Sequence, residues 1–349
     1  MMTGKVWGSI SSAWWAGVFC LAIGCGGDGA DASNQAGGAG GTAGSSSSGG
    51  SGTSGAGGSA GTGGSSGGAA GNGNAGSGNA GSSGSGALDC SGTFGTSRVL
   101  LSAAPNDELG GVTLSPDELE LFYSSITPAA VDGSHFYRST RASKADVFML
   151  GTTVPELDAA CESGQRRTMD LSHDGLRAYL VCVPPEGPAY GGSLRIADRP
   201  SLGAPFVLRT MTYGEIGNSP SISRDELTLY TTQPDGSYDY IQRYERGTTS
   251  EAFGPAEDLS LGSFDFPSSP DIGPDDLSLY FGMNTTVGVA TRASTEADFG
   301  VATELFTIAS PSAGGSPEIS RDCRSLYYIN LERSVADNST VFSIRTVTR

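Results

Sequence analysis

Short runs of alternating apolar and polar residues recur throughout the chain after residue 88, and the same small motif precedes each run. The motif is an apolar residue, a small residue, any residue and an aspartate. In the first copy, Leu114-Ser115-Pro116-Asp117 leads into the run LELFYSS. The aspartates of the five copies are Asp117, Asp174, Asp225, Asp275 and Asp322. Because alternation with a period of two is typical of strands, each copy predicts a β-hairpin whose turn carries the aspartate.

The spacing of the motif predicts the size of the repeating unit. Successive aspartates are separated by 57, 51, 50 and 47 residues. A further strand is visible after the hairpin in three copies, as SHFYRSTRAS, GSLRIADRPS and YIQRYERGTTS. Each unit therefore predicts a four-stranded blade. An aspartate in such a turn accepts hydrogen bonds from nearby backbone N–H groups, so we expect the five aspartates to have a structural role.

A second recurring signal predicts how the blades close into a ring. Phe148, Phe206, Phe253 and Phe299 each begin a short β-rich run that would form the outermost strand of a blade. The fifth blade lacks such a run, whereas residues 94–102 supply one at the beginning of the domain. The sequence thus predicts an all-β fold, a five-bladed propeller closed by its N-terminal strand. A sixth, degenerate blade is the alternative, but no unassigned stretch is long enough for it.

These units resemble the WD40-like repeats of the TolB and dipeptidyl-peptidase propellers, which have a Ser-x-Asp-Gly core. The resemblance covers residues 94–349 and implies a fold rather than an activity. Only Asp174-Gly175 retains the glycine, so we expect the other four turns to differ in detail. The peptidases carry a separate hydrolase domain beside the propeller, and no such domain is visible here, which argues against peptidase activity.

Residues 1–25 have the pattern of a signal peptide. Lys5 precedes an apolar run from Ala13 to Ile23, which is too short for a permanent membrane span. The segment that ends in Gly24-Cys25 resembles the lipobox of bacterial lipoproteins, although Ala22 stands where leucine is usual. The resemblance implies that Cys25 is lipidated and holds an exported protein in the cell envelope, at the outer membrane or cell surface. A secretory signal cleaved nearby, which would leave the protein in the periplasm, is the alternative.

Residues 26–87 form a segment of a different kind. From Ala32 to Ala87 there is no charged residue, and nearly all positions are Gly, Ser, Ala, Asn or Thr. Such a composition cannot bury a core, so we expect a disordered tether with a reach of about 40 Å. The GxGxxG match at residues 71–76 follows no strand and is not a nucleotide site. The propeller domain is then residues 88–349.

Charge and histidine content narrow the classes of function. The chain has 20 basic and 37 acidic residues, a formal net charge of −17. A surface this negative repels phosphate backbones, which argues against nucleic-acid binding, and the membrane would be contacted only through the lipid anchor. His135 and His173 are the two histidines, and no metal-binding or nucleotide-binding motif occurs in residues 88–349. We therefore expect no metal or other cofactor, and a monomer.

Four cysteines lie in the predicted domain, an even number that suits disulfide bonding outside the cytoplasm. The blade topology places Cys161 and Cys182 at one rim, and Cys90 and Cys323 at the opposite rim. We therefore predict Cys161–Cys182 and Cys90–Cys323, the second of which would clamp the ring shut. A crosslink over so long a loop stabilises a fold by roughly 5 kcal/mol at most.

Polar residues of the inner strands are the candidates for a binding site in the central channel. Two positions before the small residue of each motif stand Thr113, Asp170, Ser221, Asp271 and Glu318. Nearer the predicted strand starts stand Glu108, Arg166, Glu215 and Asp265. We single out Glu108, Arg166, Glu215, Asp265 and Asp271 as candidate ligand-binding residues; the alternative is that all of these groups line the channel or bond between blades.

The sequence favours a binding or scaffold module of the cell envelope, with an envelope protein or a glycan as its partner. Two alternatives remain open. Paired channel carboxylates would suit a propeller-type glycoside hydrolase or lyase. An accessory or sensor subunit of an envelope complex would show an apolar patch. No catalytic residue is assigned.

Overall fold

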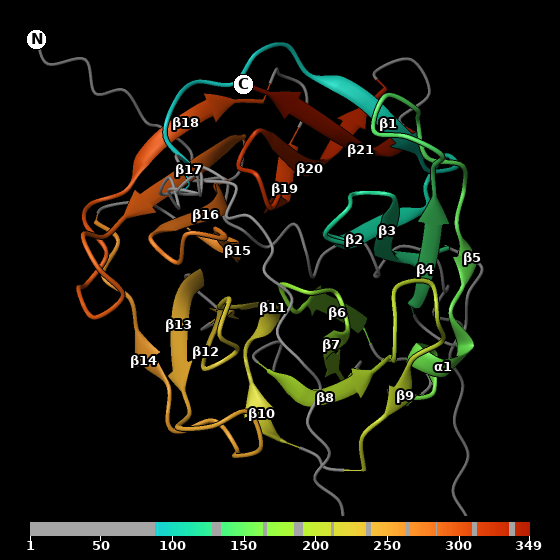
Figure 1. Cartoon of the computed structure of the whole chain (residues 1–349). Coiled ribbons are helices and arrows are strands. Elements are labelled where there is room, and N and C mark those ends of the chain that lie inside the picture. Colours follow the sequence, from blue (N-terminus) through green and yellow to red (C-terminus); the bar gives the residue numbers. More distant parts are fainter. Residues whose placement is uncertain are drawn as a thin grey trace, which may run out of the picture. The chain divides into compact units, whose positions relative to one another are not determined.

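The computed structural model shows five antiparallel β-sheets arranged as blades around a central axis (Figure 1). The structure describes residues 88, 90–127, 134–162, 166–184, 191–210, 213–234, 239–262, 266–283, 285–308, 313–334 and 339–349. Cys25, the predicted signal peptide 1–25 and the predicted tether 26–87 lie outside these residues. The five-bladed propeller predicted from the repeats is confirmed.

Each blade is a meander whose strands follow one another from the channel outward. Blade 1 comprises β2 (Glu108–Leu114), β3 (Glu120–Ile126), β4 (His135–Thr140) and β5 (Thr152–Thr153). Blade 2 comprises β6 (Arg166–Leu171), β7 (Arg177–Val183) and β8 (Gly192–Asp198), with β9 (Val207–Leu208) and β10 (Tyr213–Ile216) both paired to β8. Blade 3 comprises β11 (Asn218–Ile222), β12 (Thr228–Pro234), β13 (Asp239–Glu245) and β14 (Glu257–Asp258). Blade 4 comprises β15 (Ser268–Ile272), β16 (Ser278–Met283), β17 (Thr286–Thr291) and β18 (Thr303–Thr307).

Blade 5 is completed by the N-terminal strand, as the sequence predicts. Its strands are β19 (Ala313–Ile319), β20 (Ser325–Arg333), β21 (Thr340–Thr348) and β1 (Arg98–Ser102). The strand β1 pairs antiparallel with β21, with Leu101 opposite Ile344. The Gly95 N–H extends the ladder by donating to the Thr348 carbonyl at 2.8 Å. This closure gives the last blade four strands, as in blades 1, 3 and 4, and covers the outer edge of β21.

Apolar side chains pack in five clusters, one at each boundary between neighbouring blades. At the boundary between blades 5 and 1, for example, Leu121 of β3 and Ile344 of β21 are both fully buried. In blades 1 and 2, α1 (Pro155–Asp158) adds Leu157 to the shared cluster. Burial of these faces at about 25 cal/mol per Å² is the main driving force that holds blade to blade.

The hairpin turns share one backbone conformation in all five blades, although only one has glycine after the aspartate. The expected difference in detail occurs in blade 4, where Gly273 replaces the serine and Ser278 donates to Asp275. The residue after each aspartate has a positive φ of 54–70°. These residues are Glu118, Gly175, Glu226, Asp276 and Cys323. Each aspartate accepts the N–H two residues further on, at 2.9–3.0 Å. The local bonds and the side-chain contacts described next offset the cost of a left-handed conformation for a non-glycine residue.

The side chain in the left-handed position contacts the preceding blade. Glu226 accepts from the hydroxyl of Tyr179 at 2.5 Å, and Glu118 accepts from the hydroxyl of Tyr327. Gly175 has no side chain, and a Cβ atom built there would lie 2.6 Å from the Cδ of Pro116 in blade 1. A side chain at position 175 would therefore clash with the neighbouring blade, and only glycine fits.

The phenylalanine that recurs before each outer strand packs against an arginine that also recurs in every blade. An arginine that follows the third strand of each blade stacks over the phenylalanine ahead of the outer strand, with guanidinium-to-ring distances of 4.3–4.8 Å. The pairs are Arg141–Phe148, Arg199–Phe206, Arg246–Phe253, Arg292–Phe299 and Arg349–Phe94. In the first four pairs the arginine Nε also donates to the carbonyl of the left-handed residue, at 2.7–2.9 Å. Phe94 takes the fifth place in this pattern, in agreement with the closure by β1.

The structure forms both predicted disulfides. Cys90 and Cys323 are joined with their Cα atoms 5.0 Å apart, and Cys161 and Cys182 with theirs 5.4 Å apart. The first bridge spans 233 positions of the sequence and ties the chain ahead of β1 to the turn between β19 and β20.

We predict that Gly175→Ala destabilises the propeller more than Gly203→Ala does. Both glycines have positive φ, 70° and 79°, so each substitution adds the left-handed cost of about 1–2 kcal/mol. At position 203 a Cβ atom meets nothing nearer than 3.6 Å, whereas at position 175 it overlaps Pro116, which adds about 1–3 kcal/mol. Urea unfolding of the two variants measures the difference, and equal losses would contradict the proposed packing against Pro116.

Candidate functional site

The inner strands place one polar side chain from each blade around the central channel. These residues are Thr113 of β2, Asp170 of β6, Ser221 of β11, Asp271 of β15 and Glu318 of β19. All five are at most 5% exposed. We refer to these five residues as the interblade belt.

Each side chain of the interblade belt accepts a hydrogen bond from the backbone of the next blade around the ring. The donor is in every case the N–H of the residue that follows the neighbouring belt position. The bonds are Leu171 N to Thr113 Oγ1 (3.4 Å), Ile222 N to Asp170 Oδ2 (2.8 Å), Ile272 N to Ser221 Oγ (2.9 Å), Ile319 N to Asp271 Oδ2 (2.5 Å) and Leu114 N to Glu318 Oε1 (3.3 Å). The fifth bond returns to the first blade, so the belt is a closed cycle.

Hydroxyl groups of the belt donate to its carboxyl groups. The Thr113 hydroxyl lies 3.0 Å from Asp170 Oδ1 and 3.2 Å from Glu318 Oε1, and it has one proton to donate to either. The Ser221 hydroxyl donates to Asp271 Oδ1 at 3.5 Å. Asp170 and Glu318 thus share the Thr113 hydroxyl, whereas Asp271 has the Ser221 hydroxyl.

Burial makes the belt carboxyl groups hold their protons more strongly than free ones. Burial raises the pKa of Asp170. Burial and the neighbouring carboxyl of Asp170 raise the pKa of Asp271 well above its ordinary value. For Glu318, burial and both other carboxyl groups raise the pKa in the same way. Like charges in a low-dielectric ring repel, so the belt does not ionise fully at the pH where isolated carboxyl groups do.

The positive charge of Arg321 acts on all three carboxyl groups of the belt. It partly offsets the rise in the pKa of each of them. Arg321 Nη2 donates to the carbonyl oxygens of Leu171 and Ser172, both at 3.2 Å. The side chain therefore reaches from the turn of blade 5 to the end of the inner strand of blade 2.

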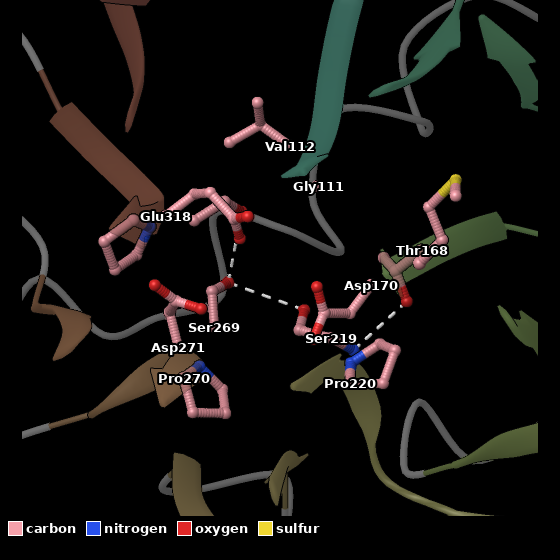
Figure 2. A pocket seen from close by; sticks show the side chains of 13 residues that line it. Gly111, Val112, Thr168, Asp170, Ser219, Pro220, Ser269, Pro270, Asp271 and Glu318 are labelled. Atoms are coloured by element: carbon pink, nitrogen blue, oxygen red, sulfur yellow. Dashed lines mark hydrogen bonds between the residues drawn. The ribbon is translucent and has the colours of Figure 1, made fainter. Parts of the chain in front are cut away.

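A second layer of polar groups lies two positions before the belt, where four of the five inner strands contain a bulge. The pairing register shifts in β2, β11, β15 and β19, and in each the residue at the bulge has a positive φ of 48–55°. The residues are Gly111, Ser219, Ser269 and Ser316; Thr168 occupies the position in the regular strand β6. The Ser269 hydroxyl lies 3.4 Å from that of Ser219 and 3.3 Å from that of Ser316 (Figure 2).

The second layer and the three carboxyl residues of the belt line a small central cavity (Figure 2). Its volume is about 290 Å³, counting the part that is open to solvent. Proline follows each of the three bulge serines and contributes apolar wall, while Asp170, Asp271 and Glu318 contribute acidic wall. The enclosed part of this space is about 20 Å³, which is enough for a water molecule and too small for a sugar ring.

The structure places four of the five candidate ligand-binding residues. Asp271 belongs to the belt, and Glu108 begins β2 opposite Ile126, half-buried. Arg166 begins β6 opposite Val183. Asp265 lies outside the described residues.

The expectation that Glu215 lies near the start of an inner strand is wrong. This residue is exposed on β10 and pairs with Ser193 of β8, so it lies at the outer side of blade 2. The reason is that residues 213–216 complete blade 2 before the chain enters blade 3 at Asn218. The serines at the bulges were missed, and the repeated Ser-Pro dipeptide at 219, 269 and 316 is the signal that could have found them.

Neither histidine lines the cavity. His135 Nδ1 contacts Asp158 Oδ2 of α1 at 2.8 Å. Burial together with the charges of Arg321 and Arg224 lowers the pKa of His173 to about 4. Among the described residues there is no group of three His, Cys, Asp or Glu side chains with the geometry of a metal site. In the same part of the chain no helix is long and apolar enough to cross a membrane.

Several solved structures share the propeller fold with this chain. TolB from Acinetobacter baumannii is 13% identical, with a TM-score of 0.41 over 68% of this chain and 54% of TolB. A xylan β-1,4-xylosidase from Bacillus halodurans is 12% identical, with a TM-score of 0.47 over 70% of this chain and 53% of the enzyme. A GH43_1 enzyme from Xanthomonas citri, complexed with xylotriose, is 11% identical, with a TM-score of 0.46 over 72% of this chain and 89% of the enzyme.

The chain thus spans about half the length of the first two of these proteins. At such identities the likeness concerns the fold alone. No family model matches the sequence, and no curated protein is significantly similar to it.

We predict that Asp271→Asn becomes more stable relative to the natural chain as the pH rises. A group with a raised pKa in the folded state contributes stability below its unfolded pKa, and this contribution is lost as the pH passes its folded pKa. Asparagine imitates the protonated form at every pH, so the two proteins converge in acid and diverge above the ordinary carboxyl range. The quantity to compare is the difference in unfolding free energy between the two proteins. His173 changes the stability of both with the opposite sign between about pH 4 and its ordinary pKa of 6.5, and the difference removes this shared contribution.

The turn residue Asp174 provides the control of opposite sign. Burial alone would raise the pKa of Asp174, but hydrogen bonds from Ser172 and the Leu176 N–H outweigh it and lower the pKa. Asp174→Asn should therefore match the natural chain in acid and be the less stable protein at neutral pH. Urea unfolding from pH 3 to 8 measures both. A difference for Asp271→Asn that is constant with pH would refute the raised pKa in the belt.

Proposed function

We propose that the propeller is a non-catalytic binding or scaffold module of the cell envelope, with an envelope protein or a glycan as its partner. The observation that supports this most directly is that the channel carboxyl groups form hydrogen bonds between blades. Asp170, Asp271 and Glu318 each hold a backbone N–H across a boundary between blades, and each is at most 5% exposed. Groups that hold the ring together in this way are poorly placed to bind a substrate. The ligand then contacts the rims or the outer faces of the blades.

The two disulfides support a location outside the cytoplasm, since such bonds persist in oxidising compartments. Lipidation of Cys25 would attach the folded domain there, and residues 26–87 would act as the spacer between lipid and propeller. An uncharged Gly/Ser spacer allows a propeller to reach a ligand over about 40 Å without fixing its orientation. This arrangement suits a module that captures a partner more than one that passes a substrate through a defined channel.

Charge complementarity narrows the partner. The net charge of −17 disfavours anionic polymers and favours cationic or neutral surfaces. A run on blade 1 between β4 and β5 also exposes apolar side chains, with Val147 at 54%, Met149 at 73% and Leu150 at 69% exposure. Exposed apolar side chains of this size are typical of protein contacts, which favours the accessory-subunit form of the proposal.

A propeller-type glycoside hydrolase or lyase is the second candidate. Its supporting observation is that Asp271 and Glu318, both with raised pKa, line the same cavity. A carboxyl group that stays protonated near neutral pH is suited to act as a general acid. Against this candidate, the cavity is small and the Oε1 of Glu318 accepts the Leu114 N–H.

We predict that Glu318→Gln leaves function unchanged. Glutamine keeps the length of the side chain and an acceptor oxygen for the Leu114 N–H, but it cannot transfer a proton. Reducing-sugar release from arabinan and xylan should be absent for both proteins. Retention on immobilised peptidoglycan and on outer-membrane fractions should be the same for the two. Glu215→Gln, at an exposed position far from the belt, is the matched control. Sugar release by the natural chain that Glu318→Gln abolishes, with an unchanged circular-dichroism spectrum, would favour the hydrolase instead.

A further inference from the structure

The chain reaches the propeller next to the disulfide that closes the ring. Leu88 is the first described residue, and Cys90 follows two positions later, ahead of β1. Cys90 is joined to Cys323, the left-handed residue of the turn between β19 and β20. A pull on the chain from its N-terminal side therefore meets the crosslink before it meets the closing strand.

Without the crosslink, such a pull would act on β1 in its weakest direction. The N-terminal end of β1 pairs with the C-terminal end of β21, and the ladder begins with the Gly95 bond to Thr348. Tension from that end would break these bonds one after another instead of all at once. At its other edge, within the described residues, β1 has one backbone bond, from the Phe148 N–H to the Leu100 carbonyl at 3.0 Å. The strand that closes the ring is thus an edge strand that tension from its N-terminal end can peel away.

With the crosslink, the same tension passes into the interior of two blades. Cys90 is 6% exposed and Cys323 is 1% exposed, and both pack in the apolar cluster between blades 4 and 5. The Tyr280 hydroxyl of blade 4 donates to the Cys90 carbonyl at 2.9 Å. The turn that carries Cys323 is tied by the Ser320 hydroxyl, which donates to Asp322 and accepts the Ser325 N–H.

We propose that Cys90–Cys323 is a tension clamp: it transmits force from the N-terminal segment to the β19–β20 turn and keeps β1 out of the force path. The clamp depends on where the chain enters the fold and not on the identity of the ligand. Tension arises in the cell if Cys25 is anchored as proposed, but the clamp itself is tested without a membrane. A failure of the anchor and a failure of the clamp are therefore separate results.

The second disulfide lies outside the path of a force that enters from the N-terminal segment. Cys161–Cys182 joins residues 21 positions apart, from the end of α1 to β7 of the same region of the ring. It lies far along the chain from the entry point and carries no force between the N-terminal segment and blade 5. Cys161→Ser/Cys182→Ser is thus the matched control for Cys90→Ser/Cys323→Ser.

The experiment is force spectroscopy on the full chain. One handle is a peptide tag inserted after Gly50, and the other is attached through Ser250→p-azidophenylalanine, at an exposed position beyond β13 in blade 3. Neither handle uses a thiol, so the disulfides stay intact until a reductant is added. Release of β1 lengthens the chain by about 60 Å, at roughly 3.5 Å for each residue from Cys90 to Asp107.

We expect the oxidised chain and the Cys161→Ser/Cys182→Ser variant to show no 60 Å step before the blades unfold. The reduced chain and Cys90→Ser/Cys323→Ser should show the step, with the lifetime of β1 at a fixed force shortened ~10-fold or more relative to the oxidised chain. Reduction of the natural chain after folding tests the clamp even if the serine variant folds poorly. The same step at the same force in oxidised and clamp-free chains would overturn the proposal, as would its absence from both clamp-free forms.

Discussion

The structure depends on the interblade belt, because it is the device that repeats at every boundary and returns to its starting point. At the belt, each inner strand has an N–H group that points toward the preceding blade and away from its own hairpin. A buried N–H without a partner costs about 1–3 kcal/mol, so each boundary needs an acceptor at one position. Hydroxyl and carboxyl side chains both satisfy that need. This accounts for the mixture of Thr113, Ser221 and three acids at equivalent places.

The outer part of each boundary is held by a different device, built from an arginine, an aromatic ring and the left-handed turn residue. The arginine stacks on a phenylalanine of its own blade, and in four blades it bonds the turn carbonyl. Where the second strand of one blade carries tyrosine, the turn of the next blade carries an acid or, in blade 5, the disulfide cysteine. Where that strand carries Phe122, with no hydroxyl, the next turn carries Gly175. The turn sequences therefore vary with the neighbour across the boundary, while the turn conformation stays the same.

This dependence on the neighbouring blade explains which features were predictable. The repeat itself carries the hairpins, the blade number, the closing strand and both disulfides, because each follows from period, spacing and the order of strands. The left-handed residues were not predicted because Glu118 and Cys323 are unfavourable there when considered locally, and they are held by partners about 200 residues away. Glu215 was misplaced because one blade ends and the next begins within a few residues, and alternation does not mark that boundary. The arginine–phenylalanine stacks were missed because the two residues belong to different strands.

The belt also changes what an acidic channel indicates about function. Three carboxyl groups around a central cavity invite the interpretation of a catalytic centre, and the raised pKa values of Asp271 and Glu318 strengthen that impression. Yet a buried carboxyl that accepts a backbone N–H and repels two neighbours has a raised pKa for structural reasons alone. A structural carboxyl differs from a catalytic one in that its hydrogen bond is also made in blades that have no acid at the equivalent position. Thr113 and Ser221 perform the same bond as Asp170 and Asp271, so the bond, and not the charge, is the property that the five positions share.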